Sequence, residues 1–181
     1  MGALYFITGS CGSGKSTLLA AVKAARPGLS AHHTDSMGVP SVEEMIERFG
    51  STDAWQAHRL GEWVARAAAA PGLTVVDGQA RPHAIFEAAR EVGLGAVRVV
   101  LVDCGHAERR VRLLEQRRQP DLDVLDTYAW AAYLRGQADA LGLEVIDTTG
   151  QTLADSTALL DVSIARFAAE SGVPLEAPAA R

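Results

Sequence analysis

The sequence predicts an α/β protein with three layers, in which helices cover both faces of a five-stranded, mostly parallel sheet. Segments with the composition of strands alternate with segments of helical periodicity along the whole chain. The first segment, residues 3–8, is a short run of apolar, β-branched and aromatic side chains, as expected of a buried strand. Strands that alternate with helices favour a parallel sheet, because each helix returns the chain to the start of the next strand.

Each expected element is supported by its own residues. Apolar and β-branched runs indicate five strands: 3–8, 29–35, 73–77, 96–103 and part of 143–150. Helical periodicity and end signals indicate seven helices, each range including the residues that stop the helix: 16–28, 39–50, 52–72, 81–93, 106–118, 126–142 and 152–172. The strand at 29–35 is the weakest of the five.

Residues that start or stop helices support these boundaries. The first helix stops at Pro27 and the third at Pro71, each followed by glycine. Ser41 with Glu44 three residues later forms a capping box, and Pro82 lies near the first turn of the fourth helix. Further stop and cap signals are Pro120, Thr152 and Asp155.

The elements are expected to form a single domain over residues 1–173, since the chain of 181 residues contains no linker and no internal repeat. Residues 36–72 place two helices between the second and third strands, a longer crossover than a minimal unit needs. We expect this insertion to form a flap that faces the substrate. The last residues, 174–181, are expected to form a loose tail.

Composition narrows the functional classes. Hydrophobic residues make up 48% of the chain and charged residues 22%, as in a globular protein. The net charge of −5 argues against a nucleic-acid partner. No apolar stretch has the length of a membrane span and no signal peptide is recognisable, so we expect a cytoplasmic protein without a membrane partner. Cys11 and Cys104 do not suggest a disulfide framework, and nothing indicates an oligomeric state.

A glycine-rich loop follows the first strand and leads into the first helix. Its sequence, GSCGSGKS, fits the phosphate-binding pattern Gly-x-x-x-x-Gly-Lys-Ser/Thr in the strand–loop–helix context that this pattern requires. We expect Lys15 to contact the β- and γ-phosphates of ATP and Ser16 to offer its hydroxyl to Mg²⁺. The residues expected to surround the nucleotide are Gly9, Ser10, Cys11, Gly12, Ser13, Gly14, Lys15, Ser16 and Thr17. The loop indicates a P-loop NTPase fold, with the expected strand order 2-3-1-4-5.

Other motifs exclude several classes of nucleotide-binding protein. A guanine-specific GTPase needs an Asn-Lys-x-Asp or Thr-Lys-x-Asp element, but this chain has no asparagine and neither lysine is followed two residues later by aspartate. The Ser-Gly-Gly-Gln signature of transporter ATPases is also missing. The chain is too short for the larger ATPase machines that carry a separate sensor domain.

The third strand ends in VVDG, where Asp77 is placed to hold Mg²⁺ through a water molecule. Motor ATPases have a glutamate after this aspartate, which activates a water for hydrolysis, whereas Gly78 follows here. We expect Gly78 to leave room beside Asp77. The stretch argues against a hydrolytic motor and favours transfer of a phosphoryl group to a second substrate.

Residues 77–81, DGQAR, resemble the Asp-Gly-x-Pro-Arg stretch of adenylate kinases and the wider nucleoside-monophosphate-kinase superfamily. The shared residues are Asp77, Gly78 and Arg81, and Ala80 stands where adenylate kinases have proline. The resemblance implies that Arg81 holds the phosphate, or another polar group, of the acceptor. In outline it covers most of the chain, but close identity is limited to the phosphate loop and these residues.

The helix after the fourth strand, ERRVRLLEQRR, is similar to the helix that enters the lid of these enzymes. The resemblance implies a lid over residues 117–136, in which Arg117 and Arg118 reach the transferring phosphoryl group and favour transfer electrostatically. Arg135 is a further candidate to cross the site, and DTTG at 147–150 resembles the loop that meets adenine. The arginines expected to face solvent instead are Arg109, Arg110 and Arg112.

The acceptor class depends on Asp35, which ends the second expected strand. A hydroxyl acceptor benefits from a positioned carboxylate, whereas a nucleoside monophosphate needs arginines and no base. Ligands bind at the carboxyl ends of parallel strands, and kinases that resemble shikimate kinase and chloramphenicol phosphotransferase also carry an acid after the second strand. Asp35 is therefore the candidate base or hydroxyl-orienting group, with a turn-forming residue as the alternative.

We therefore favour ATP- and Mg²⁺-dependent transfer of a phosphoryl group to a small-molecule hydroxyl. The alternatives are a nucleoside monophosphate kinase and a non-kinase ATP-binding regulator or slow ATPase. Trp55, His58 and Trp63 in the flap could line the acceptor pocket, although aromatic residues at helical spacing more often belong to the core. His32 and His33 lie on opposite faces of their strand, and at least one is expected to be packed.

Overall fold

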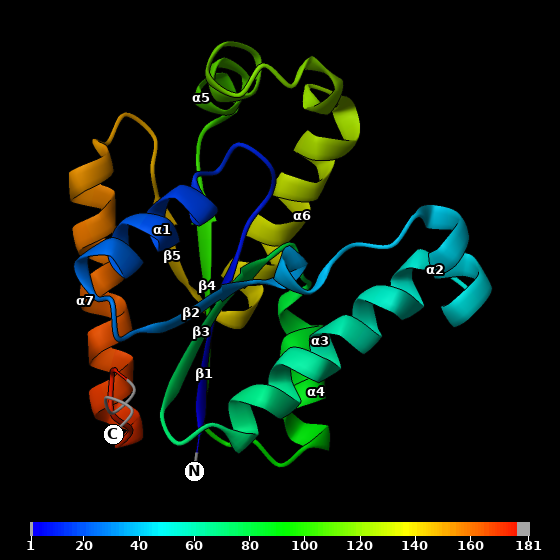
Figure 1. The fold of residues 1–181 in the computed structure, drawn as a ribbon. Helices are drawn as coiled ribbons and strands as arrows, with labels where there is room; N and C mark the ends of the chain where they lie inside the picture. Colours follow the sequence, from blue (N-terminus) through cyan, green and yellow to red (C-terminus); the bar gives the residue numbers. More distant parts are fainter. Residues whose placement is uncertain (1, 177–181) are drawn as a thin grey trace.

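The computed structural model describes residues 2–176 and contains a sheet of five parallel strands in the order β2-β3-β1-β4-β5. This is the strand order expected from the sequence, and the whole sheet lies between two layers of helices (Figure 1). The strands are β1 Ala3–Thr8, β2 Ser30–His33, β3 Leu73–Gly78, β4 Val97–Asp103 and β5 Glu144–Asp147.

Seven α-helices occur within the described residues. They are α1 Lys15–Ala25, α2 Val42–Phe49, α3 Thr52–Ala69, α4 Pro82–Glu91, α5 His106–Val111, α6 Leu125–Leu141 and α7 Leu153–Ser171. The described residues also contain three short helical segments: the 3₁₀ turns η1 Thr34–Met37 and η3 Pro120–Leu122, and the π-helical segment η2 Arg112–Gln116. Helices α1 and α7 cover one face of the sheet, and α3, α4 and α6 cover the other (Figure 1).

The side chains of β1 explain the three layers. All six residues of this central strand are buried, and successive side chains point to opposite faces. Tyr5 and Ile7 join the core cluster under α1 and α7, while Leu4 and Phe6 join the cluster under α3 and α4. A strand that is apolar on both sides can be buried only when helices cover both faces, so the sequence of β1 requires this architecture.

Several boundary signals are confirmed, and the second strand is corrected. Ser41 and Glu44 form the expected capping box of α2, and the Thr152 hydroxyl caps α7 by accepting a hydrogen bond from a backbone N–H. The second strand ends at His33 instead of residue 35, because residues 34–37 form a 3₁₀ turn. Asp35 therefore lies on a turn just beyond the strand.

The flap and the tail differ in how they contact the domain. In the flap, α2 projects away from the sheet, supported by α3 (Figure 1), and Met45 is its buried residue. The described part of the expected tail is docked, since the Leu73 N–H donates to the Pro174 carbonyl at 3.2 Å and Leu175 packs against the core. Residues 177–181 of the expected tail lie outside the described residues. No described helix has both the length and the apolar surface to cross a bilayer.

Candidate active site

The phosphate-binding loop connects β1 to α1, and its conformation depends on glycine. Gly12 and Gly14 have φ angles of 75° and 96°, a left-handed region that other residues rarely adopt. Gly14 directly precedes Lys15, the first residue of α1, so the loop opens onto the positive end of that helix. The Ser13 hydroxyl is buried in the loop and has no hydrogen-bond partner within residues 2–176.

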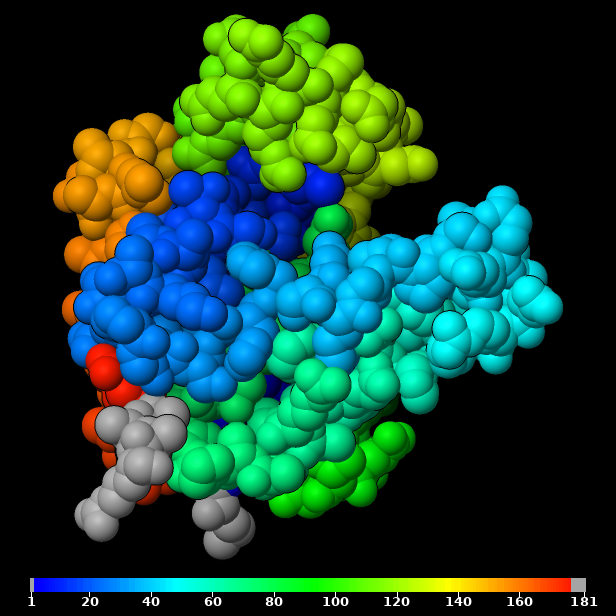
Figure 2. All heavy atoms as spheres, viewed as in Figure 1, coloured from blue at the N-terminus to red at the C-terminus, as the bar shows by residue number. Residues whose placement is uncertain are grey.

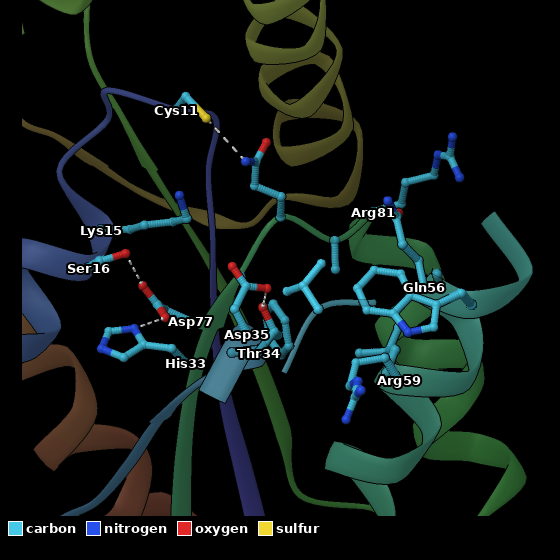
Figure 3. A pocket seen from close by; sticks show the side chains of 18 of the residues that line it. Cys11, Lys15, Ser16, His33, Thr34, Asp35, Gln56, Arg59, Asp77 and Arg81 are labelled. Atoms are coloured by element: carbon cyan, nitrogen blue, oxygen red, sulfur yellow. Dashed lines mark hydrogen bonds and ion pairs between the residues drawn. The ribbon is translucent and has the colours of Figure 1, made fainter. Parts of the chain in front are cut away.

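Lys15 extends into the cavity beside the loop (Figure 3). Burial lowers the pKa of its ammonium group, and the Asp77 carboxylate opposes this shift. The guanidinium of Arg117 is near enough to lower the pKa of Lys15 further. Negative charge placed beside Lys15 would offset both effects, so this position is suited to an anionic ligand such as a nucleotide phosphate.

The carboxylate of Asp77 lies at the end of β3 and is almost completely buried, with 3% of its side chain exposed. Its two oxygens have different partners. Ser16 donates its hydroxyl hydrogen to Oδ2 at 2.6 Å, and Nδ1 of His33 contacts Oδ1 (Figure 3). A carboxylate so deeply buried needs such partners, because an unpaired buried charge is costly.

These residues fit Mg²⁺ and nucleotide phosphates. Hydroxyl and carboxylate oxygens are the ligands that Mg²⁺ prefers, and those of Ser16 and Asp77 are 2.6 Å apart. Within the described part of the chain, no three His, Cys, Asp or Glu residues converge as metal ligands. Ser16 and, through water, Asp77 would hold Mg²⁺, and Lys15 with the loop backbone would hold the phosphates.

The expectation that Arg109 faces solvent is wrong, because this arginine is buried beneath the loop and is 1% exposed. Its guanidinium donates to the carbonyl of Cys11 at 2.6 Å and to Oδ1 of Asp103 at 2.6 Å. A further hydrogen bond reaches the Cys104 carbonyl at 3.2 Å. Arg109 therefore links the phosphate loop to the end of β4, and the ion pair with Asp103 compensates its buried charge.

Arg112, which was also expected to face solvent, is a second arginine that binds the phosphate loop. Its guanidinium donates to the carbonyl of Ser13 at 3.2 Å and to the hydroxyl and carbonyl of Thr148 at 2.8 and 2.9 Å. The Thr148 hydroxyl also donates to the Ser13 carbonyl at 3.0 Å. Thr148, in the loop after β5, thus helps to hold the phosphate loop in place. Arg110 is exposed as expected and pairs with Asp123 at 3.3 Å.

The two arginines expected at the lid lie in different places. The segment Arg112–Gln116 is π-helical, and the Arg117 N–H donates to the Arg112 carbonyl five residues earlier at 2.9 Å. Arg117 lines the cavity, whereas Arg118 does not. Arg118 has a φ of 52°, the only positive φ among the described non-glycine residues, and it turns the chain away at the end of the helix.

A cavity of about 870 Å³ lies between the phosphate loop, the flap and the lid (Figure 3). Figure 2 shows the surface hollowed between the flap and the lid residues above it. Polar and charged residues that line the cavity are Lys15, Ser16, His33, Thr34, Asp35, Asp53, Gln56, Arg59, Asp77, Gln79, Arg81 and Arg117. Apolar and aromatic residues in its wall include Phe6, Val39, Trp55, Leu60, Ala84 and Trp130.

Asp35 reaches this cavity from the turn η1, which is tightly fixed at its base. A Cβ atom at Gly78 would lie 2.4 Å from Cγ2 of Thr34. Gly78 therefore makes room for the Thr34 side chain instead of leaving free space beside Asp77, as was expected from the sequence. Trp63 donates its indole N–H to the Thr34 carbonyl at 3.3 Å. The Asp35 carbonyl accepts a hydrogen bond from Gly38 at 2.9 Å, and its carboxylate remains exposed to the cavity.

Arg81 lies at the start of α4 and lines the cavity. Its guanidinium is 3.9 Å from the Asp53 carboxylate of α3 and lies over the Trp130 ring of α6, 5.7 Å from the ring centroid. Three separate helices thus contribute to the surroundings of this one side chain. Arg135 is not among the lining residues and pairs with Asp139 on its own helix.

The flap aromatics divide between cavity and core. Trp55 lines the cavity, with Arg59 stacked over its ring at 5.7 Å. Trp63 is 2% exposed and belongs to the core cluster under α3 and α4. His58 is exposed and lines no part of the cavity. Arg59, which the sequence analysis did not single out, was identifiable only by its place four residues after Trp55 on the same helix face.

No known family model and no curated protein sequence matches this chain. Its structure is nevertheless similar to solved structures along almost its whole length. The tunicamycin resistance protein of Deinococcus radiodurans has a TM-score of 0.62 and 19% identity, over 98% of this chain and 100% of that chain. Thymidylate kinase from Candida albicans has a TM-score of 0.59 and 12% identity, over 91% and 92% of the two chains.

Shikimate kinase from Acinetobacter baumannii, in complex with shikimate, has a TM-score of 0.57 and 15% identity, over 92% of this chain and 94% of that chain. The chain has the fold of the P-loop small-molecule kinases. At these identities the likeness concerns the fold. Within this P-loop kinase fold, the phosphate loop and the cavity beside it supply the basis for a proposal about the reaction.

Proposed function

We propose that this protein is an ATP-dependent phosphotransferase that moves the γ-phosphoryl group of Mg-ATP to a hydroxyl group of a small molecule. One observation carries the proposal: the Asp35 carboxylate borders the same cavity as Lys15, Ser16 and Asp77. A phosphate site and a candidate base thus share a single cavity, as transfer to an alcohol requires.

The residues have distinct roles in this proposal. Asp35 accepts the hydroxyl proton as the acceptor oxygen bonds to the γ-phosphorus and the bond to the ADP oxygen breaks. Lys15 and Arg117 stabilise the charge on the phosphoryl oxygens. Bound Mg²⁺ would neutralise charge on the β- and γ-phosphates. Arg81, between Asp53 and Trp130, orients a polar group of the acceptor.

The acceptor side of the cavity favours a hydroxyl compound that also has an apolar or ring surface. The carboxylates of Asp35 and Asp53 would repel a doubly charged phosphate acceptor, whereas they can accept hydrogen bonds from hydroxyl groups. Trp55 and Trp130 provide flat apolar walls. The similarity of the fold to shikimate kinase and to a tunicamycin resistance protein is compatible with a small-molecule acceptor.

A nucleoside monophosphate kinase is the second candidate. Arg81 and Arg59 both border the acceptor side, and arginines can hold an acceptor phosphate. The fold is also similar to a thymidylate kinase. A non-kinase ATP-binding regulator or slow ATPase is the third candidate, and it predicts ADP release that no acceptor stimulates.

The test is a phosphate-transfer screen with ATP and Mg²⁺ over polyols, amino alcohols, hydroxylated antibiotics, nucleosides and nucleoside monophosphates. We expect an alcohol to stimulate ADP release. Asp35→Asn should then reduce kcat for the alcohol by about 10²–10⁴-fold and leave ADP affinity unchanged. Asp53→Asn, a change of the same kind in the same cavity, should mainly raise the KM of the acceptor. Lys15→Ala should abolish transfer.

Four outcomes would contradict the proposal in different ways. Transfer to an alcohol at the wild-type rate by Asp35→Asn would remove Asp35 as the base. Stimulation by nucleoside monophosphates alone would favour the second candidate. ADP release that is indifferent to every acceptor would favour the regulator or ATPase, and full activity of Lys15→Ala would refute the phosphate site.

A further inference from the structure

The side chain of His33 contacts the buried carboxylate of Asp77. We propose that His33 is a positioning residue for Asp77, and that it fixes this carboxylate in the orientation in which Oδ2 faces Ser16 and bound Mg²⁺. The inference rests on the proposed function, because it takes Ser16 and Asp77 as the residues that hold Mg²⁺ with the nucleotide.

Strand register brings the two residues together. His33 is the last residue of β2 and lies directly opposite Asp77 of β3 in the parallel pairing. Paired residues on neighbouring strands point to the same face, and Nδ1 of His33 contacts Oδ1 of Asp77 (Figure 3). Oδ2 accepts a hydrogen bond from Ser16 at 2.6 Å. His33 therefore occupies one oxygen of the carboxylate and leaves the other for the metal side.

Burial shows which partner depends on the other. The Asp77 side chain is 3% exposed, whereas the His33 side chain is 49% exposed. The contact therefore matters most to the buried carboxylate, which would otherwise turn or take up water. His33 itself contributes little to packing, in contrast to His32, whose ring packs on Trp63 with centroids 5.1 Å apart.

The backbone of His33 also joins the two sides of the site. It precedes the turn η1, and its carbonyl accepts a hydrogen bond from the Ser36 hydroxyl at 2.7 Å. The same turn carries Asp35, so one residue anchors the turn with its backbone and the Asp77 carboxylate with its ring. The ring is consequently held at a fixed position relative to β3, as a positioning role requires.

Substitutions that move the hydrogen-bonding group test the role. The side-chain amide of His33→Asn can occupy the place of Nδ1, whereas the amide of His33→Gln lies farther out, near the place of Nε2. The measured quantity is the Mg²⁺ concentration that gives half-maximal ADP binding, determined by calorimetry on the full-length protein. We expect His33→Ala and His33→Gln to raise this concentration about 10-fold or more, and His33→Asn to stay within about 2-fold of wild type.

ADP affinity without Mg²⁺ should be the same in all variants. His58→Ala is the matched control, because this histidine is also about half exposed and does not line the cavity. An unchanged Mg²⁺ requirement in His33→Ala, or equal effects of the Asn and Gln variants, would overturn the role of Nδ1. If the Ala variant fails to fold, the comparison of Asn with Gln still decides the question.

Failure of the inference can be distinguished from failure of the proposed function. Wild-type protein that binds ADP in an Mg²⁺-dependent manner, yet transfers phosphate to no acceptor, would refute the proposed function and leave the role of His33 open to the same test. ADP binding by wild type without any Mg²⁺ dependence would overturn both.

Discussion

Replacing Arg109 with methionine removes a guanidinium that is 1% exposed and that holds the phosphate loop to the end of β4. Loss of one partner of a buried ion pair costs about 3–5 kcal/mol of unfolding free energy. The Asp103 side chain is 16% exposed and can be partly hydrated, and methionine preserves part of the packing. We therefore expect a loss near the lower end, about 3 kcal/mol.

The loss should also be visible in nucleotide binding. Without Arg109 the Cys11 carbonyl loses a 2.6 Å hydrogen bond, and the loop that surrounds the phosphates is less fixed. We expect ADP affinity to fall about 10-fold, which corresponds to about 1.4 kcal/mol. Urea unfolding followed by far-UV circular dichroism measures the first effect, and calorimetric titration with ADP measures the second.

Two further variants make the test specific. Arg110→Met, one position away with 63% of its side chain exposed, should change the unfolding free energy by less than about 0.5 kcal/mol. The pair Arg109→Met with Asp103→Asn should lose less than the sum of the single changes, because no partly buried carboxylate is left unpaired. A cost below about 1 kcal/mol for Arg109→Met, with unchanged ADP affinity, would refute the reasoning.

Three other changes test the turn, a partly buried histidine and a partly exposed ion pair. Gly78→Ala should lower kcat about 10-fold or more, because its methyl would lie 2.4 Å from Cγ2 of Thr34 and displace the turn that carries Asp35, the proposed base. Adding Thr34→Ala should restore most activity, and an unchanged kcat in Gly78→Ala would contradict this reasoning. Burial lowers the pKa of His32, so just below about pH 6.5 the unfolded state binds more protons than the folded state. The free energy of unfolding should therefore decrease as the pH is lowered through this range. Urea titrations of His32→Asn should lack this pH dependence. Asp161→Asn should cost about 1 kcal/mol, since Arg26 donates two hydrogen bonds to Asp161. Arg26 lowers the pKa of Asp161, so the higher unfolding free energy of the wild type should persist at neutral pH. In urea titrations this difference should disappear as the pH falls through the lowered pKa of Asp161.

The features that the sequence predicted well are those set by neighbouring residues. The phosphate loop needs only a strand, its glycines and a helix in succession, and all three occur in the structure. The capping box at Ser41 and Glu44 is similarly local. The strand order follows from the fold that the loop indicates, and the sheet confirms it.

The inward positions of Arg109 and Arg112 were not predictable from helical periodicity. An arginine in a charged helix is usually solvated, and only the position of α5 and η2 beside the phosphate loop gives these two arginines backbone carbonyls to bind. The sequence signal that existed was Asp103 at the end of the fourth strand, six residues before Arg109. That spacing becomes meaningful only when the phosphate loop is known to lie within reach of the same guanidinium.

The different positions of Arg117 and Arg118 have a similar explanation. The π-helical segment Arg112–Gln116 makes its hydrogen bond over five residues instead of four, so the helix face rotates relative to the regular pattern. A sequence pattern that assumes a regular helix cannot decide which of two adjacent arginines faces the cavity. The contact of His33 with Asp77 was equally hidden, because it depends on the register of β2 with β3.

All three tryptophans of the chain lie in the wall of the cavity or next to it. Trp55 and Trp130 line the cavity, and the indole N–H of Trp63 donates a hydrogen bond to Thr34 in the turn that carries Asp35. Light absorbed at the red edge of the protein spectrum therefore excites only indoles near this cavity. The unlabelled protein thus contains its own optical reporter, and its fluorescence can be used to identify compounds that enter the cavity before any reaction is measured.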